Sequence, residues 1–104
     1  MGRAGNDLYI MQSDVTGAIK IGRSKDVHRR LRQLQTGSPY RLRLVLHLPG
    51  QANIERKLHR RVASFRLKTK GEWFHYEALI HLPNEIYELL DLDVVDEWWV
   101  KTPL

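Results

Sequence analysis

The sequence predicts an α+β fold, in which a small three-stranded antiparallel sheet is flanked by helices and followed by a short helical C-terminal extension. Two short β-branched and aromatic segments, 8–11 and 19–22, are separated by turn residues, as is typical of a hairpin. Apolar residues then recur at helical spacing in later segments. The chain of 104 residues, 42% of them apolar, is long enough for one domain with a modest core.

The hairpin places two polar side chains on one face. If Ile19 and Ile21 face the core, strand alternation puts Tyr9 and Lys20 together on the opposite face, beside Gly22. A phenol with a pKa near ~10 is a poor base at neutral pH, but a neighbouring cation favours phenolate. This face of the hairpin is therefore a candidate site.

A first helix is predicted after the hairpin. Val27, Leu31 and Leu34 recur at helical spacing and form a stripe that can pack on a sheet. Ser24 can cap this helix at its N-terminus, and Gly37 is a natural C-terminal stop.

The third strand is predicted at 41–48, where apolar and polar residues alternate. Leu42, Leu44 and Leu46 are expected on one face of this strand, and Val45 on the other. Pro49 and Gly50, which follow, are expected to end it.

Two further helices are predicted downstream. The first covers about 51–65, because its apolar residues recur every three to four positions. Residues 72–74 are expected to form a short extended piece. Pro83 suits the first turn of a last helix that ends near Leu90.

The charge is divided unevenly along the chain. Residues 1–74 carry 16 Lys and Arg against 5 Asp and Glu, a net charge of +11, whereas residues 75–104 carry one Lys against 7 Asp and Glu, a net charge of −6. A basic body with an acidic tail indicates a polyanionic partner, most simply nucleic acid.

Composition also restricts the kinds of metal site, the cellular compartment and the partners that are expected. The sequence has no cysteine, which excludes disulfides and thiolate metal sites and fits a reducing cytoplasm. No segment approaches the ~20 apolar residues of a membrane span, so no membrane partner is expected.

Four sequence blocks occur in an order that resembles the GIY-YIG nucleases. The blocks are Leu8-Tyr9-Ile10, Lys20-Ile21-Gly22, Glu55-Arg56-Lys57-Leu58-His59 and Gly71-Glu72-Trp73-Phe74. Lysine in the second block is similar to a branch of this family found in phage and bacterial proteins. The resemblance covers roughly residues 7–76, so the whole chain is expected to be one GIY-YIG-like domain with an acidic extension at 77–104.

The resemblance implies roles for three hairpin and helix residues. Tyr9 is expected to help activate the attacking water, with Lys20 either in the place of the family's second tyrosine or on the phosphate. Arg30 matches the family's helix arginine, and it borders the apolar stripe of its predicted helix. Its guanidinium would stabilise negative charge that develops at the scissile phosphate.

Glu55 matches the family's acidic metal ligand. One carboxylate implies a single Mg²⁺ or Mn²⁺ ion completed by water and phosphate oxygens. The structural alternative for Glu55 is a helical ion pair with His59 or Arg56. His59 can assist proton transfer from the same helix face or serve only in packing. Glu72 can brace the site or a cation, and the two aromatic residues that follow it are expected in the core.

The predicted function is metal-dependent hydrolysis of DNA phosphodiester bonds by an endonuclease of low intrinsic sequence specificity, to which a targeting protein can contribute. The alternative is a catalytically weak or inactive DNA- or RNA-binding module on the same scaffold. A protein-interaction module would explain Trp98-Trp99 but not the basic body, and the sequence indicates no oligomeric state. The predicted nucleic-acid contacts are Arg23, Arg29, Arg32, Arg60, Arg61, Lys68 and Lys70.

Overall fold

The computed structural model describes residues 6–68 and 72–90. Four strands form one antiparallel sheet in the spatial order β3-β1-β2-β4, with β1 paired to both β2 and β3. The α+β class is as predicted, but the sheet has a fourth strand. The strands are β1 (Asp7–Ser13), β2 (Ile19–Ser24), β3 (Leu42–Leu48) and β4 (Trp73–Phe74).

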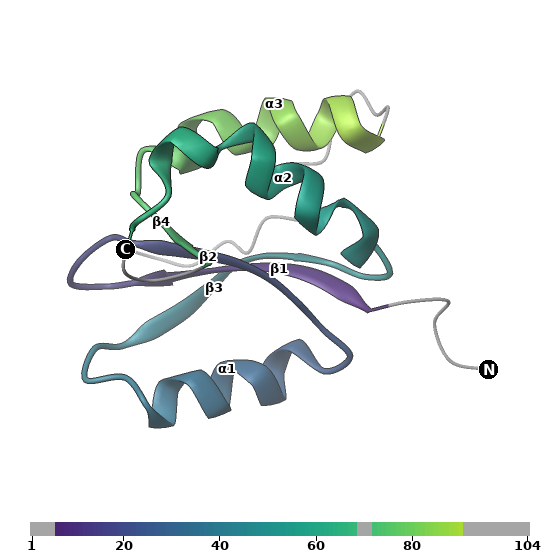
Figure 1. Ribbon diagram of the computed structural model, residues 1–104. Coiled ribbons are helices and arrows are strands. Elements are labelled where there is room, and N and C mark those ends of the chain that lie inside the picture. Colours follow the sequence, from purple (N-terminus) through teal and green to yellow (C-terminus); the bar gives the residue numbers. More distant parts are fainter. Residues whose placement is uncertain (1–5, 69–71, 91–104) are drawn as a thin grey trace.

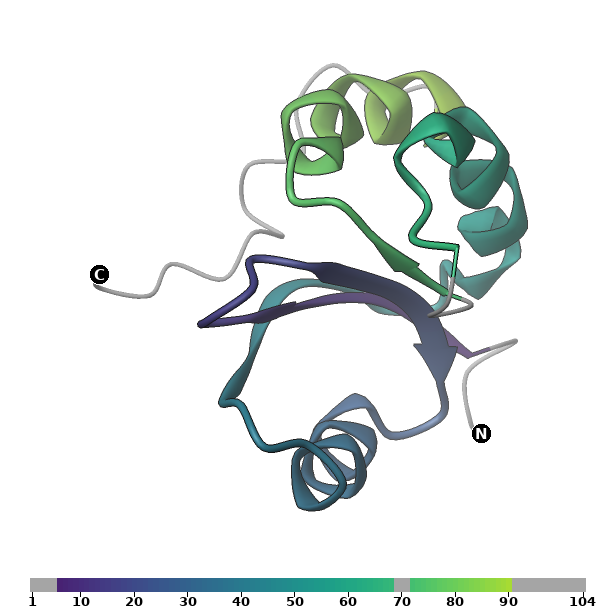
Figure 2. The ribbon, with the colours of Figure 1, turned by 60° about the vertical axis from the view of Figure 1, so that its left-hand side comes forward.

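The helices lie on both faces of the sheet (Figure 1). One face is covered by α1 (Val27–Thr36), and the other by α2 (Glu55–Arg61) and α3 (Ala78–Leu90), as the turned view of Figure 2 also shows. Short 3-10 helices, η1 (Ala52–Ile54) and η2 (Ala63–Phe65), flank α2. The result is a three-layer arrangement with the sheet in the middle.

The two faces of the sheet support cores of different size. Alternation along β1 sends Leu8 and Ile10 to the α2/α3 face, where they join a large buried cluster. Tyr9 and Met11 point to the α1 face, where Val27 is the other fully buried member of a much smaller cluster. The side of the sheet that carries Tyr9 is therefore the less heavily packed one.

The alternation predicted for β3 is wrong at one point. Ile10 pairs with Leu46 but Met11 pairs with Leu44, so Val45 is an extra residue in the ladder, a β-bulge. The bulge moves Leu44 to the cluster under α1, whereas Leu46 stays in the cluster under α2 and α3. A uniform leucine pattern in the sequence concealed this change of face.

The helix boundaries also differ in part from the prediction. Asp26, not Ser24, caps α1, since its carboxylate accepts a hydrogen bond of 3.0 Å from the backbone N–H of Arg29. Gly37 follows the helix as expected. The helix predicted over 51–65 is present but is divided into η1, α2 and η2.

The last helix begins earlier than predicted. Pro83 lies inside α3, not in its first turn. The helix starts at Ala78 because Ala78, Leu82 and Ile86 repeat every four residues and are all buried in the large cluster. The C-terminal extension predicted from residue 77 is therefore part of the main core as far as Leu90. Within the described residues, no helix is long and apolar enough to cross a membrane.

Candidate active site

Tyr9 and Gly22 face each other across the β1–β2 pair. The Tyr9 side chain is buried, with 1% of its surface exposed. A Cβ atom built on Gly22 would overlap the Tyr9 hydroxyl and ring. Glycine at this position therefore allows the phenol to lie across β2, which places its hydroxyl over the neighbouring strand.

Charged residues from both helical layers act on this hydroxyl. Burial raises the pKa of Tyr9 above its ordinary value, while a hydrogen bond from Arg30 and its positive charge act in the opposite direction. The negative charges of Glu72 and Glu55 raise the pKa further. Arg30 belongs to α1 and Glu55 to α2, and these helices cover opposite faces of the sheet (Figure 1). Charged side chains from both faces therefore act on Tyr9.

This convergence is located at an open stretch of strand edge. β4 pairs only with Ile19 and Lys20, so among the described residues no strand lies on the side of β2 away from β1 between Ile21 and Ser24. Side chains from α1, α2 and the start of β4 can meet where the sheet ends. We call the group at this position the edge site, and it comprises Tyr9, Lys20, Arg30, Glu55, His59 and Glu72.

Lys20 shares the sheet face of Tyr9, as alternation predicted, but its ammonium group has another partner. Lys20 Nζ lies 2.7 Å from Glu72 Oε2, and the residue is only 7% exposed. The cation that contacts Tyr9 is Arg30. A neighbouring cation thus acts to lower the pKa of Tyr9, as expected, but this cation is Arg30 rather than Lys20, and the larger effect of burial leaves the pKa raised.

Glu72 connects Lys20 to the rest of the edge site. Burial alone would raise the pKa of Glu72, but the hydrogen bond and charge of Lys20, with the charges of His59 and Arg30, more than offset it. The pKa of Glu72 consequently lies below its ordinary value, and the carboxylate stays ionised at neutral pH. Sequence reasoning expected Glu72 to brace the site or a cation, but it did not identify Lys20 as its partner. That bond depends on the pairing of Lys20 with Trp73 in the fourth strand.

Glu55 is half-buried at the first turn of α2, and its carboxylate forms no hydrogen bond or ion pair within residues 6–68 and 72–90. The helical ion pair with His59 or Arg56 is therefore not formed. An unpaired carboxylate oxygen close to a basic cluster has the chemistry of a ligand for a hard divalent cation. No group of three or more His, Asp or Glu in the described part of the chain is arranged to hold a metal. A cation held by Glu55 would take its other ligands from water and substrate.

His59, one turn after Glu55, has its imidazole fixed in place. Its Nε2 lies 2.8 Å from the carbonyl oxygen of Ile21, and its ring contacts Phe74 edge-on with centroids 5.1 Å apart. A carbonyl oxygen can only accept, so Nε2 must carry the proton of this bond. In the neutral imidazole, Nδ1 is then the free acceptor.

The predicted nucleic-acid contacts do not form one uniform group. Arg61 lies on the side of α2 that faces α3, where it binds the carboxylates of Glu85 and Glu88 at 3.2 and 3.0 Å. Lys70 lies outside the described residues. Arg61 is nevertheless exposed, as are the other predicted contacts that the structure describes, namely Arg23, Arg29, Arg32, Arg60 and Lys68.

The comparison with protein families gives a match that spans most of the chain. The model of the T5orf172 domain matches residues 8–100. This chain belongs to the T5orf172 domain family. The match includes every residue of the edge site, so this T5orf172 domain carries the whole group within its family region. The comparisons with curated proteins and with solved structures found no match.

Proposed function

We propose that this T5orf172 domain is a metal-dependent endonuclease of the GIY-YIG type, which hydrolyses phosphodiester bonds of DNA in the cytoplasm. The observation that carries the proposal is the unpaired Glu55 carboxylate beside the Tyr9–Arg30 contact at the open edge of β2. Membership of the T5orf172 family is compatible with a nuclease or DNA-binding role. The net charge of +11 on residues 1–74 supports a polyanionic substrate.

The reaction sets a clear requirement for the site. Water must bond to phosphorus while one phosphorus–oxygen bond of the backbone breaks, so the water loses a proton and the leaving oxygen gains one. Arg30 is suited to the phosphate, because a guanidinium stabilises the negative charge that develops on its oxygens. Glu55 would hold Mg²⁺ or Mn²⁺, which supplies further positive charge to the phosphate and acidifies water when bound.

Two residues of the edge site can handle the proton of the attacking water. Tyr9 is a neutral phenol at neutral pH, since its ordinary pKa is already about 10 and burial raises it further, so it can orient the water by hydrogen bonding. His59 offers Nδ1 as an acceptor, since its Nε2 is used by the Ile21 carbonyl. Lys20 holds the Glu72 carboxylate in place and acts as a positioning residue.

The direct test is cleavage of supercoiled plasmid with and without Mg²⁺ or Mn²⁺. We expect nicked or linear DNA only with metal, and a loss of several orders of magnitude for Glu55→Gln. Affinity for DNA in EDTA should hold or improve in this variant, because a negative charge has left a basic surface. Glu77→Gln makes the same chemical change outside the edge site and should cleave like the parent. Parental cleavage by a folded Glu55→Gln protein would refute the assignment.

A second candidate function is a nucleic-acid-binding module without useful catalysis. It is favoured by one observation, namely that neither Tyr9 nor Lys20 is activated: burial raises the pKa of the phenol, and the ammonium is bound to Glu72. In that case the parent binds DNA but does not cut it with any divalent metal. We also propose a targeting protein, because a domain of low intrinsic sequence specificity needs a partner that selects the DNA. In the binding-module case, this partner would supply all of the selectivity for particular DNA sites.

A further inference from the structure

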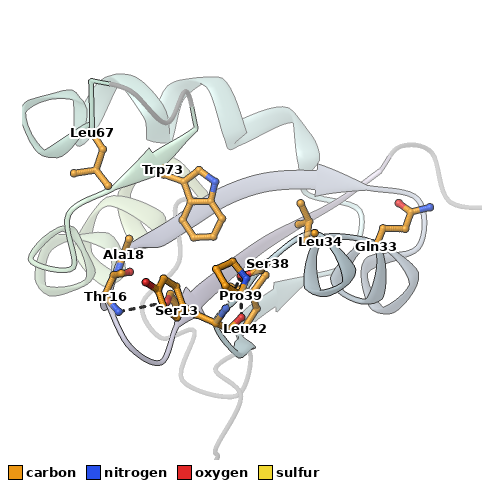
Figure 3. A pocket seen from close by; sticks show the side chains of 12 residues that line it. Ser13, Thr16, Ala18, Gln33, Leu34, Ser38, Pro39, Leu42, Leu67 and Trp73 are labelled. Atoms are coloured by element: carbon orange, nitrogen blue, oxygen red, sulfur yellow. Dashed lines mark hydrogen bonds between the residues drawn. The ribbon is translucent and has the colours of Figure 1, made fainter.

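A pocket of about 470 Å³ lies on the α1 face of the sheet, beyond the edge site (Figure 3). It is bordered by the β1–β2 turn, the end of α1, the loop after it and β4. The volume falls in the range of small-molecule sites, roughly 300–1,000 Å³. Its apolar and aromatic lining includes Leu34, Pro39, Tyr40, Leu42, Leu67 and Trp73.

One wall of the pocket is held in place by side-chain hydrogen bonds. The amide of Gln35 donates to the carbonyl of Tyr40 at 3.0 Å and accepts from the backbone N–H of Leu42 at 2.7 Å. The hydroxyl of Ser38 donates to the same Tyr40 carbonyl at 2.8 Å. The loop that presents Tyr40 is thus ordered before any ligand arrives, which lowers the entropic cost of binding.

The pocket is continuous with the edge site through two of its lining residues. Trp73 is the strand partner of Lys20, whose ammonium lies 5.8 Å from the centre of the indole ring. Gln33 Oε1 lies 3.5 Å from the guanidinium of Arg30. If a phosphate of a nucleic-acid strand bound at Arg30, a nucleotide of the same strand could therefore reach the neighbouring aromatic-lined pocket.

We propose that this pocket binds one unpaired nucleobase of the nucleic-acid substrate, stacked against Trp73. The inference deepens the proposed function, on which it rests, by naming the substrate class as DNA with an extrahelical base. Base stacking on aromatic side chains is favourable and tolerant of sequence. A base within a duplex cannot enter such a cavity unless it leaves the helix, so a bulged or unpaired base is the preferred ligand.

The surroundings of the pocket favour a nucleotide over an apolar peptide side chain. The exposed Arg41 adjoins the lining residues Tyr40 and Leu42, and the exposed Lys68 adjoins Leu67. The negative charge of the nearby Asp14 is offset by Arg43, whose Nε lies 3.7 Å from Asp14 Oδ1. Hydroxyl groups of the lining, among them that of Thr16, can bond to base edges.

The test compares two DNA duplexes that differ only by the presence of one nucleobase. One carries a single bulged nucleotide, and the other carries an abasic residue at the same bulge. Affinities are measured for the full chain in EDTA, so that cleavage plays no part. We expect the bulged base to bind about tenfold more tightly, in line with the usual contribution of one stacked base. Equal affinities for the two duplexes would overturn the proposal.

Variants assign the preference to the pocket. Tyr40 is 43% exposed and Tyr76, which does not line the pocket, is 50% exposed, so Tyr40→Ala and Tyr76→Ala form a matched pair. Tyr40→Ala should reduce the ratio of affinities several-fold, whereas Tyr76→Ala should keep it. Trp73→Phe should retain most of the preference and Trp73→Leu should lose it. An unchanged ratio in folded Tyr40→Ala and Trp73→Leu would place the base elsewhere and refute the proposal.

A spectroscopic measurement reports stacking directly. With 2-aminopurine as the bulged base, the parent should quench its fluorescence on binding, and Tyr40→Ala should quench it less. The outcomes for the two proposals are separable. If the parent never cleaves DNA but keeps the base preference, only the nuclease proposal fails. If it cleaves DNA with no base preference, only the pocket proposal fails.

Discussion

At the scale of single residues, the fit between Gly22 and Tyr9 is the tightest feature of the edge site. We predict that Gly22→Ala lowers the free energy of unfolding by about 1–3 kcal/mol, because the new methyl group must displace the phenol. The same change should reduce DNA cleavage, since the hydroxyl moves relative to Arg30. Thermal or urea unfolding and plasmid cleavage would measure the two effects.

Gly37→Ala is the matched control for this substitution. A Cβ atom at Gly37 would meet only the Leu34 carbonyl oxygen at 3.9 Å, and the backbone there has a negative φ of −89°. We therefore expect near-parental stability from this variant. Equal stability for both alanine variants would show that the Tyr9 ring is not held against β2.

The ionisation of Tyr9 gives a second prediction at this scale. Burial raises its pKa, so the phenol should lose its proton only above the ordinary tyrosine value of about 10. The difference in tyrosinate absorbance between the parent and Tyr9→Phe, recorded in EDTA during an alkaline titration, isolates this group. A phenolate that forms near neutral pH would contradict the prediction and would mark Tyr9 as a ready base.

The Lys20–Glu72 pair predicts a pH dependence of stability. The pKa of Glu72 is depressed in the folded protein, so its contribution should be fully present above the ordinary glutamate pKa of about 4.5. It should be lost as the pH falls through the lower, folded value. Glu72→Gln should therefore be less stable than the parent at pH 6 and should match it in strong acid.

A double-mutant comparison isolates the pair. In a Lys20→Met background the ammonium that lowers the pKa of Glu72 is gone, so Glu72→Gln should have a weaker pH-dependent effect on the unfolding midpoint. The same effect in both backgrounds would mean that the 2.7 Å contact of Lys20 is not what stabilises the Glu72 carboxylate.

Sequence patterns could place some residues of the site but not their partners. Strand alternation put Tyr9 and Lys20 on one face, and helical spacing put Glu55 and His59 one turn apart. These local patterns could not identify the side chain that pairs with Lys20. Glu72 is distant in the chain, and its position depends on the register of a strand of only two residues. Long-range pairings of this kind leave little signal in a local pattern.

At the scale of elements, α2 presents different basic residues to different surroundings. Successive helical residues lie about 100° apart around the helix axis, so residues of α2 face different directions. Glu55 and His59 face the edge site, whereas Arg61 faces α3. Arg60 points outward and is exposed. The two adjacent arginines are therefore not equivalent for binding a polyanion.

This difference gives a prediction about salt dependence. Arg60→Ala should flatten the slope of log affinity for duplex DNA against log salt by about 0.9, the effect of one lost phosphate contact. Arg61→Ala should change that slope less, because its guanidinium is already paired with the carboxylates of Glu85 and Glu88. Binding measured across a salt series decides between them. A larger change for Arg61 than for Arg60 would place the DNA on the α3 side.

Elements with a strong, regular pattern were predictable, and the irregular ones were not. The Val27, Leu31 and Leu34 stripe identified α1 because its three apolar residues lie on one face over about two turns. The bulge at Val45 was hidden, since an extra residue inserted into a leucine-rich strand leaves every local preference satisfied. Pro83 was misplaced because its usual preference for a first turn was overridden by the buried face of α3.

At the scale of the whole molecule, the two layers that supply the edge site differ in how firmly they are held. Of α1, only Val27 is fully buried, whereas α2 and α3 share the large cluster with β1 and β2. We predict that amides of α1 exchange with solvent by a local opening that costs less free energy than exchange of β1 amides. Native-state hydrogen exchange would measure both. Equal protection would mean that the two layers open only together.

The contact between His59 and the Ile21 carbonyl has a consequence for the solubility of the protein. A strand edge with unpaired backbone groups can recruit a strand from another molecule and begin aggregation. The edge of β2 has to stay open if a substrate is to reach Tyr9, so it cannot be closed by another strand. His59 occupies one of its acceptors, and the exposed Arg23 places charge next to it. The same imidazole that serves the proposed chemistry thus also discourages intermolecular strand addition.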